Sequence, residues 1–172
     1  VTSLIALSAM LGVVAAGDLL TLYLFFEWLG LIGYLFVVHE GGRAAQRAGV
    51  KYLILSLAGG LALLAGVLAV QALGGGALAA ALPATPGREG LRAAAAILLL
   101  AGFGVKAGVL GLHIWLPDAH SAAPAPASAL LSGVIIKAGA YGIARTLGVL
   151  LGPADGLGDG LAEAAIWIGL AT

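Results

Sequence analysis

The sequence predicts an all-α fold, a polytopic transmembrane helical bundle. Of its 172 residues, 62% are hydrophobic and only 9% are charged, against roughly 25% charged in an ordinary soluble domain. Eight basic and eight acidic side chains are too few to cover the surface of a soluble protein of this size. Long apolar runs also alternate with short segments rich in glycine, proline and charge, as expected of helices that cross a ~30 Å hydrocarbon layer.

Charge and cysteine content exclude several classes of protein. The formal net charge is zero, so nothing indicates a nucleic-acid partner. The chain has no cysteine, which excludes a disulfide framework, a thiolate metal site and an iron–sulfur cluster bound by this chain. We therefore expect no cofactor in this chain, and any electron transfer in its system to occur elsewhere.

Six apolar segments follow one another. Asp18 is placed to cap the second, which ends near Val38 and carries Glu27 in its interior. The third becomes wholly apolar after Tyr52 and contains glycines suited to close helix packing. The expected ranges of the six segments are 1–16, 18–38, 43–73, 91–115, 127–151 and 161–172.

The connections between these segments indicate the organisation of the chain. Residues 74–90 form the longest connection, an extramembrane loop and the best candidate for a linker, and residues 152–160 form another loop. We expect 1–172 to be a single transmembrane domain with about four full helices and a partial one at each end, a piece of a longer protein. Basic residues divide equally between the two sides, so the positive-inside rule leaves the orientation open.

Two lysines lie deep inside apolar segments. Lys106 precedes Pro117 by eleven residues, and Lys137 follows Pro126 by eleven, which places each about 16 Å from the proline-rich turn if both flanks are helical. That is near mid-membrane, where a charge costs roughly 2.5 to 3.5 kcal/mol to insert. Snorkelling to the interface is the simple alternative, although the distance exceeds the reach of a lysine. If the two ammonium groups are close, their repulsion favours loss of a proton, which a proton relay needs.

Glycines concentrate around Lys106. A loosened or broken helix of the kind that transporters use at ion sites is therefore expected, and a glycine packing face is compatible with it. His113 follows Lys106 by two helical turns and would share its face on a continuous helix. The glycines are Gly102, Gly104, Gly108 and Gly111.

Other ionisable residues have weaker assignments. Lys51 is expected at a depth similar to Glu27, either as its partner in a static pair or proton path, or simply at the interface. Tyr141, four residues after Lys137, can hydrogen-bond on the same helix face. The spacing of His113, Asp118 and His120 matches no metal-ligand pattern, so we expect no metal. We place His113 on a proton path and assign His120 and Asp118 to ordering the turn.

Three stretches carry a resemblance to a known family. FFEWLGLIGYL, AGVKYLILSLAGG and HIWLPDAHSAAPAPASALLSGVIIKAGAYGIAR resemble the antiporter-like, proton-conducting membrane subunits shared by respiratory complex I, group 4 membrane-bound hydrogenases and multisubunit sodium/proton antiporters. The likeness is nearest to the hydrogenase-type subunits or the middle antiporter-like subunit of complex I. Where many relatives carry prolines just after the central lysine, this chain has Gly108 and Gly111.

The resemblance implies a fold and a function. The fold would be one five-helix repeat of an inverted-repeat bundle in a prokaryotic inner membrane. Glu27 would be the carboxylate of the first central helix, Lys106 the lysine of the discontinuous helix and Lys137 the relay lysine, with His113 before the WLP motif. Lys51, His120 and Tyr141 are further relay candidates.

Three functions remain open. The first is a proton-translocating subunit of a redox-driven complex, a translocase part of an oxidoreductase without a redox centre of its own. The second is a sodium/proton antiporter subunit, and the third is a structural subunit with inert ion pairs. The expected partners are other membrane subunits, the lipid bilayer and protons, with Na+ in the antiporter case.

Overall fold

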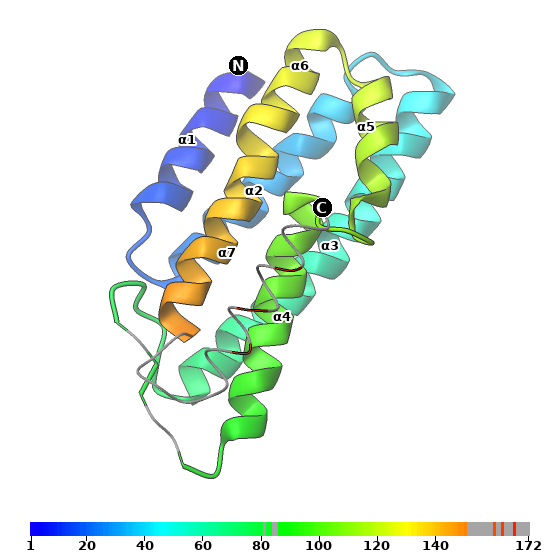
Figure 1. Cartoon of the computed structure of the whole chain (residues 1–172). Helices are drawn as coiled ribbons and strands as arrows, with labels where there is room; N and C mark the ends of the chain where they lie inside the picture. Colours follow the sequence, from blue (N-terminus) through cyan, green and yellow to red (C-terminus); the bar gives the residue numbers. More distant parts are fainter. Residues whose placement is uncertain (81, 84–85, 151–159, 161–162, 164–166, 168–172) are drawn as a thin grey trace.

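The computed structural model describes residues 1–80, 82–83, 86–150, 160, 163 and 167. Apart from an isolated bridge between Asp18 and Ala77, the regular structure of these residues is helical, which confirms the all-α prediction. Figure 1 shows the helices running roughly side by side in an elongated bundle. They are α1 (Thr2–Ala15), α2 (Leu19–Val38), α3 (Gly42–Ala72), α4 (Glu89–Ala107), η1 (His113–Trp115), α5 (Leu116–Ala122), α6 (Ala125–Leu130), η2 (Leu131–Ile135) and α7 (Ile136–Leu150).

Four helical stretches of the described chain are long and apolar enough to cross a membrane. Their number agrees with the four full spans expected from the sequence, and α1 is a shorter apolar helix before them. The predicted segment at 161–172 and the loop at 152–160 lie outside the described residues, apart from Gly160, Glu163 and Trp167. The four stretches are Leu19–Val38, Gly42–Ala72, Glu89–Ala107 and Ala125–Leu147.

Asp18 begins α2 as the sequence predicts. Its carboxylate accepts hydrogen bonds from the backbone N–H of Thr21 at 2.8 Å and from the Thr21 hydroxyl at 2.7 Å. Both bonds favour the ionised carboxylate, with the backbone bond the larger cause, so the pKa of Asp18 lies below its ordinary value. The cap satisfies one of the free N–H groups in the first turn of the helix.

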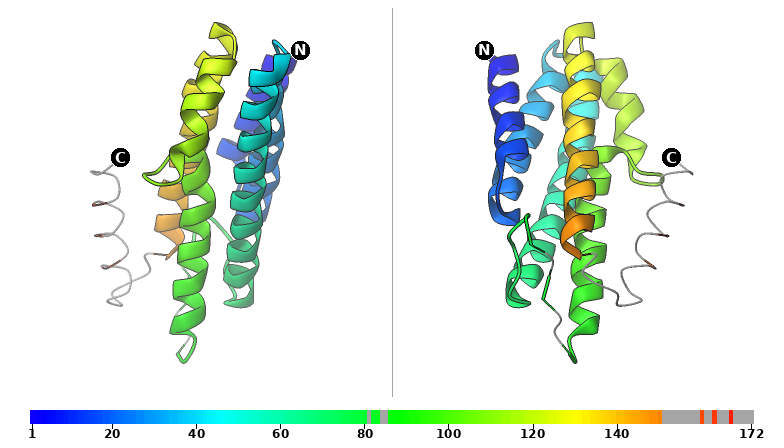
Figure 2. Two further views of the ribbon diagram at one scale, coloured as in Figure 1. Left: turned by 90° about the vertical axis from the view of Figure 1, so that its right-hand side faces the viewer. Right: turned by 60° about the vertical axis from the view of Figure 1, so that its left-hand side comes forward.

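Consecutive helices pack against each other, and α7 returns to lie along α4. Figure 2 shows this arrangement from two sides. A Cβ on Gly102 of α4 would stand 2.7 Å from the carbonyl oxygen of Gly59 of α3, and one on Gly139 of α7 would meet the backbone of Ala107. Glycine is therefore needed at both crossings, because any side chain would push the helices apart.

The segment expected to be one helix over 91–115 is interrupted. Helix α4 ends at Ala107, with Gly108 in the left-handed conformation at φ +72°. The turn Gly108–Leu112 leads into η1 and α5, a short helix with Pro117 in its first turn. The break near Lys106 is confirmed, but the helix is shorter than predicted, and Pro117 starts a new helix.

The following span is continuous but irregular. α6 passes directly into η2, a π-helical stretch, and then into α7. Stretches of this kind are frequent at functional sites in long helices.

The long loop after α3 packs onto the bundle. Leu78 donates its N–H to Gly17, and Leu82 donates its N–H to Val149, both at 2.9 Å. The side chain of Leu82 is only 3% exposed. The loop candidate for a linker thus covers the end of the bundle where α1 leads into α2 and α7 ends.

Candidate functional site

Lys106 is the second-last residue of α4, immediately before the break. A helix end leaves carbonyl groups without partners in the helix. Here the backbone N–H groups of Gly108 and Val109 bond to the carbonyl of Gly104. The indole Nε1 of Trp115 donates to the carbonyl of Val105 at 2.7 Å. These hydrogen bonds stabilise the break, and one of them comes from Trp115, which is fully buried.

The ammonium group of Lys106 lies in a buried pocket between α2, α3 and α4. The residue is only 2% exposed. Its Nζ stands 5.3 Å from the ring centroid of Phe26 and 5.6 Å from that of Tyr52. Contacts of this kind stabilise a desolvated cation by up to about 2 kcal/mol each, which offsets part of the burial cost.

Two glycines create the space for the charged groups. A Cβ on Gly30 of α2 would meet Nζ of Lys106, and one on Gly60 of α3 would stand 2.6 Å from a carboxylate oxygen of Glu27. Glu27 and Gly30 are three residues apart, so they lie on the same face of α2. The sequence therefore places the carboxylate and the seat of the lysine one helical turn apart.

Glu27 and Lys106 face the same interior without being joined. Neither Oε1 of Glu27 nor Nζ of Lys106 has a hydrogen-bond partner. The one ion pair among the described residues, Lys51 with Asp118, includes neither of them. Glu27 is partly exposed, whereas Lys106 is buried. A partly buried acid and a buried base thus lie one helical turn apart along α2 but are not joined by an ion pair.

The pocket also contains polar groups from α3. The hydroxyl of Tyr52 donates to the carbonyl of Gly30 at 3.0 Å. Ser56, buried one turn further along α3, stands with its Oγ 3.2 Å from the point where a Cβ on Gly30 would lie. The sequence analysis did not assign Tyr52, Ser56, Gly30 or Trp115 to the site. Only the spacing of Gly30 from Glu27 could have indicated one of them.

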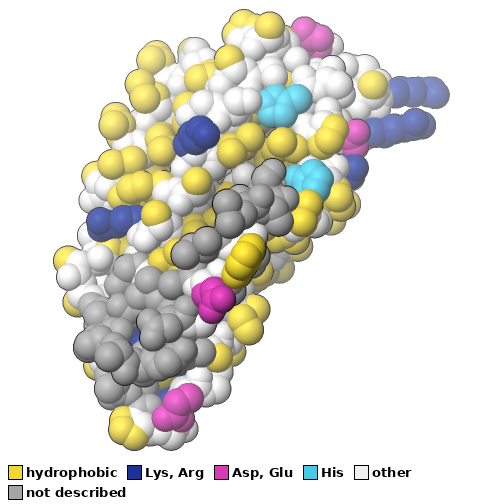
Figure 3. All heavy atoms as spheres, viewed as in Figure 1, with side chains coloured by type: hydrophobic (Ala, Val, Ile, Leu, Met, Phe, Trp, Pro, Cys, Tyr) yellow, Lys and Arg dark blue, Asp and Glu magenta, His cyan; other side chains and the backbone are white. Residues whose placement is uncertain are grey.

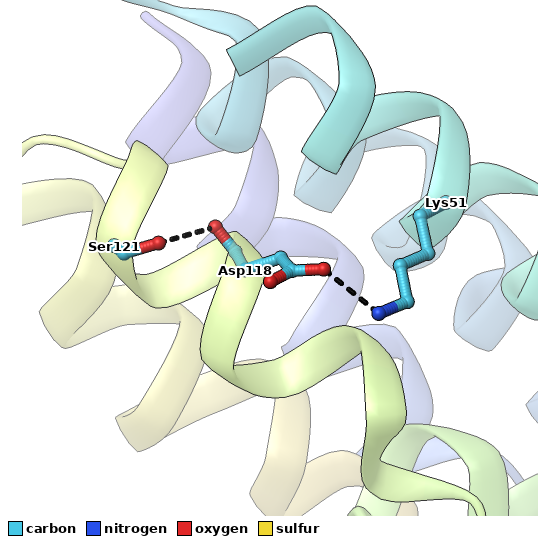
Figure 4. A network of polar contacts seen from close by, with 3 residues as sticks. All are labelled: Lys51, Asp118 and Ser121. Atoms are coloured by element: carbon cyan, nitrogen blue, oxygen red, sulfur yellow. Dashed lines mark hydrogen bonds and ion pairs between the residues drawn. The ribbon is translucent and has the colours of Figure 1, made fainter. Parts of the chain in front are cut away.

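Lys51 does not pair with Glu27, so the pairing considered from the sequence is wrong. Its ammonium bonds to Asp118 of α5 at 2.8 Å, as Figure 4 shows. The two side chains are 40% and 52% exposed. The positions of Lys51 and Glu27 in the sequence predict that they lie at similar depth. They do not show that the side chain of Lys51 points toward α5 rather than α2. Its other expected position, near the interface, agrees with this exposure.

Lys137 lies at a height similar to that of Lys106 but points elsewhere. Gly139, two residues later, packs on the backbone of Ala107, next to Lys106. Lys137 itself is exposed on the outer face of the chain. Tyr141, expected to assist Lys137, donates instead to the carbonyl of Val14 in α1 at 3.1 Å. The contact of Gly139 with Ala107 places the two lysines at neighbouring levels of the bundle, but the two ammonium groups do not share the same surroundings.

The two histidines of the motif are held by local bonds. His113 lies beyond the break, half-buried, and its Nδ1 accepts from the N–H of Gly111 at 3.2 Å. Because the helix does not continue, His113 does not share a helix face with Lys106. His120 lies 2.6 Å through Nδ1 from the hydroxyl of Ser128, joining α5 to α6, in keeping with its expected role in ordering the turn. The described residues bring together no group of three or more potential metal ligands.

A bundle of apolar helices with an interrupted span and ionisable groups in its interior is the architecture of a polytopic membrane protein. Residues 16–169 match the family described as "NADH:quinone oxidoreductase/Mrp antiporter, TM". The chain belongs to this family. It is an integral membrane protein, and its bacterial relatives fit a prokaryotic plasma membrane.

Relatives and solved structures agree with this assignment. The chain is 42% identical over 147 residues to an uncharacterised protein of Mycobacterium tuberculosis, with 85% of this chain and 23% of the relative covered. It is 39% identical over 146 residues to NAD(P)H-quinone oxidoreductase chain 4 of Picosynechococcus, with 83% and 27% covered. The chain thus spans about a quarter of the length of these relatives.

Two solved complexes contain the same fold. A chain of the archaeal membrane-bound sulfane sulfur reductase matches with a TM-score of 0.76 and 29% identity, over 85% of this chain and 30% of that one. A chain of the Mrp complex of Dietzia matches with a TM-score of 0.77 and 27% identity, over 87% and 17%.

Proposed function

We propose that this chain is part of a proton-translocating membrane subunit of a redox-driven complex, and that protons pass through Glu27 and Lys106. One observation carries the proposal: beside an interrupted span, the buried Nζ of Lys106 and the buried Oε1 of the partly exposed Glu27 face the same interior, and neither atom has a hydrogen-bond partner. Inert structural charges in a membrane are expected to be tied up in close pairs. Here Gly30 and Gly60 provide the space that the two unpaired charged groups occupy.

The arrangement suits a proton exchange between the two groups. A lysine in a closely bonded pair would have to break that pair before it released a proton. Lys106 is instead held by two aromatic faces, and its flexible side chain lies at the end of α4. Moving one charge against 100 mV costs about 2.3 kcal/mol, so a route built from several such stations is physically reasonable.

The other predicted residues extend the route in this proposal. Lys137, at the height of Lys106 on the outer face of α7, passes the proton to the part of the protein beyond this chain. His113 and His120 follow the break on the path to the surface. Tyr141 positions α7 against α1 through its bond to Val14, and Lys51 with Asp118 marks the surface end of the path.

Partners and driving force follow from what the relatives are. The relatives named here are a quinone oxidoreductase chain and chains of respiratory and Mrp complexes. We propose that the full-length protein likewise works beside other membrane subunits, which carry the redox cofactors. This chain spans about a quarter of its relatives' length, and in this proposal it supplies one half of a transmembrane route.

The test is the proton-to-electron ratio of the full-length protein in its complex, measured in sealed vesicles. We expect Lys106→Met to lower translocation through this subunit by about 100-fold or more, the usual contribution of a positioned acid or base. Arg88→Gln is the matched control. Arg88 is an exposed cation just before α4, and it bonds to the carbonyl of Ala72 at the far end of α3. An unchanged ratio in Lys106→Met, in a fully assembled complex, would reject the role and leave a structural charge.

The likeness to the Mrp complex supports a second candidate, sodium/proton antiport through the same pair. The two functions separate by sodium dependence. Proton movement that continues unchanged in sodium-free vesicles supports redox-driven translocation, whereas movement that requires a sodium gradient supports antiport.

A further inference from the structure

The first turns of α3 carry a row of three cations. Arg43, Arg47 and Lys51 are spaced four residues apart, so they follow one another along the same side of the helix. Arg43 and Arg47 are exposed, and neither has a hydrogen bond or ion pair within the described part of the chain. Figure 3 shows basic side chains projecting from the edge of the molecule where α3 begins.

The row lies where lipid headgroups are expected. Helix α3 has 31 residues, about 46 Å at 1.5 Å per residue, and so exceeds a ~30 Å hydrocarbon layer by several turns. The polar turn His39–Gly41 precedes it, and the helix carries no charged residue after Lys51. The three cations span about 12 Å between the turn and the apolar part, which corresponds to the interfacial region.

A groove joins this row to an apolar surface. It has a volume of about 540 Å³ and runs between α3 and η1. Its cationic wall is formed by Arg43, Arg47 and Lys51, and its apolar wall includes Val50, Ile54 and Ile114. These three apolar side chains are 50%, 62% and 49% exposed. A charged upper part and an apolar lower part match an amphiphile rather than a small soluble anion.

We propose that this groove binds an anionic phospholipid. Its phosphate is held by Arg43 and Arg47 with help from Lys51, and an acyl chain lies on Ile54 and Ile114. Charge complementarity supports this occupant, because one carboxylate, Asp118, offsets only one of the three cations. A protein partner would need its own acidic segment at the same depth in the membrane. The site shares Lys51 with the surface end of the proposed proton path. Lipid binding is measured without proton movement, so a failure of this proposal would leave the proton proposal untouched.

The experiment uses the full-length protein, delipidated and titrated with phosphatidylglycerol or phosphatidylcholine, with bound lipid counted by native mass spectrometry. The wild type is expected to prefer phosphatidylglycerol. Each cation near an anionic headgroup contributes about 5-fold in affinity, so the double variant Arg43→Gln/Arg47→Gln is expected to bind about 30-fold more weakly. Arg88→Gln, which removes a cation at the opposite end of α3, is expected to bind normally.

A second variant tests the same idea in the opposite direction. Asp118→Asn releases Lys51 from its ion pair, so phosphatidylglycerol is expected to bind up to about 5-fold more tightly. This variant decides the matter even if the double variant fails to fold. Three outcomes would each overturn the proposal. They are equal binding of the two lipids, displacement of the bound lipid by millimolar inorganic phosphate, and loss of a partner protein subunit from the double variant while its lipid binding stays unchanged.

Discussion

Two lysines with a carboxylate nearby differ in almost every physical respect. Lys51 and Asp118 meet at 2.8 Å on a half-exposed surface. Lys106 and Glu27 lie in a pocket between three helices, where Nζ and Oε1 have no hydrogen-bond partners. Lys51 and Asp118 are bonded to each other, although water could form hydrogen bonds with both of these exposed groups. Nζ of Lys106 and Oε1 of Glu27 are the atoms that remain without a hydrogen-bond partner.

This contrast separates structural from functional charge. The remaining polar groups around the break are well satisfied: the indole of Trp115 bonds to Val105, and the hydroxyl of Tyr52 bonds to Gly30. Around the break, the chain therefore satisfies these structural polar groups and leaves open Nζ of Lys106 and Oε1 of Glu27. Nε of Arg145 in α7 is also buried without a partner, so the contrast applies to the surroundings of the break and not to the whole bundle.

The largest expected effect comes from filling the space that the ammonium group of Lys106 occupies beside Gly30. In Gly30→Ala, the new Cβ takes the place of Nζ of Lys106, so the ammonium must move. A displacement of about 1 Å from a working geometry can cost up to about 100-fold in rate. We expect proton translocation by the full complex to fall by up to that factor. Gly90→Ala is the control, since nothing lies within 4 Å of its Cβ. Equal rates in both variants would contradict the proposed pocket.

Next in size is the removal of the bond that closes the break. Trp115→Phe keeps an aromatic ring against Tyr52 but removes the indole donor to Val105. Leaving a buried carbonyl without a partner costs about 1 to 3 kcal/mol. We expect a lower melting temperature in detergent and faster hydrogen exchange of amides near the end of α4. Trp28→Phe, at a position 54% exposed, should change neither. A local exchange rate unaltered by Trp115→Phe would show that the break does not depend on this bond.

A smaller effect with a defined pH dependence is expected at Asp18. Its pKa is lowered chiefly by the backbone N–H of Thr21, so its contribution is present above the unfolded pKa and is lost as pH falls through the folded one. Asp18→Ala should cost about 1 kcal/mol near neutral pH. Asp18→Asn should keep most of the cap, because asparagine also caps well, while removing this part of the acid sensitivity below about pH 4. Unfolding measured from pH 3 to 7 compares the three proteins. Parallel acid profiles for Asp18→Asn and wild type would refute the assignment.

Much of the fold is predictable because membrane spans depend on composition and length. The four spans, the cap at Asp18 and the break near Lys106 follow from hydrophobic runs, a capping residue and a cluster of glycines. The end of α4 at Ala107 is not predictable to the residue, since Gly104, Gly108 and Gly111 are all able to end a helix. Only the tertiary bond from Trp115 to Val105 distinguishes where the chain turns.

The site is predictable in its members but not in its geometry. That Glu27 and Lys106 turn toward the interior follows from the cost of exposing charges to lipid in apolar segments. The direction in which a side chain leaves its helix depends on rotation about the helix axis, and depth alone does not supply it. For that reason the sequence offers Glu27 as one possible partner of Lys51, beside a position at the interface, but does not indicate Asp118. It likewise matches Lys137 in depth to Lys106 without showing that Lys137 is exposed.

The smallest expected effect belongs to the surface pair itself. A half-exposed ion pair contributes about 0 to 1 kcal/mol, because water and salt screen it. In a double-mutant cycle of Lys51→Met and Asp118→Asn, we expect a coupling energy within that range. It should shrink as salt rises from 0.1 M to 1 M and the screening length falls from about 10 Å to about 3 Å. Thermal unfolding of the four proteins at both salt concentrations measures it. A coupling well above 1 kcal/mol, insensitive to salt, would mean that this pair is shielded in the full complex, and that Lys51 then resembles Lys106 more closely than its exposure in this chain indicates.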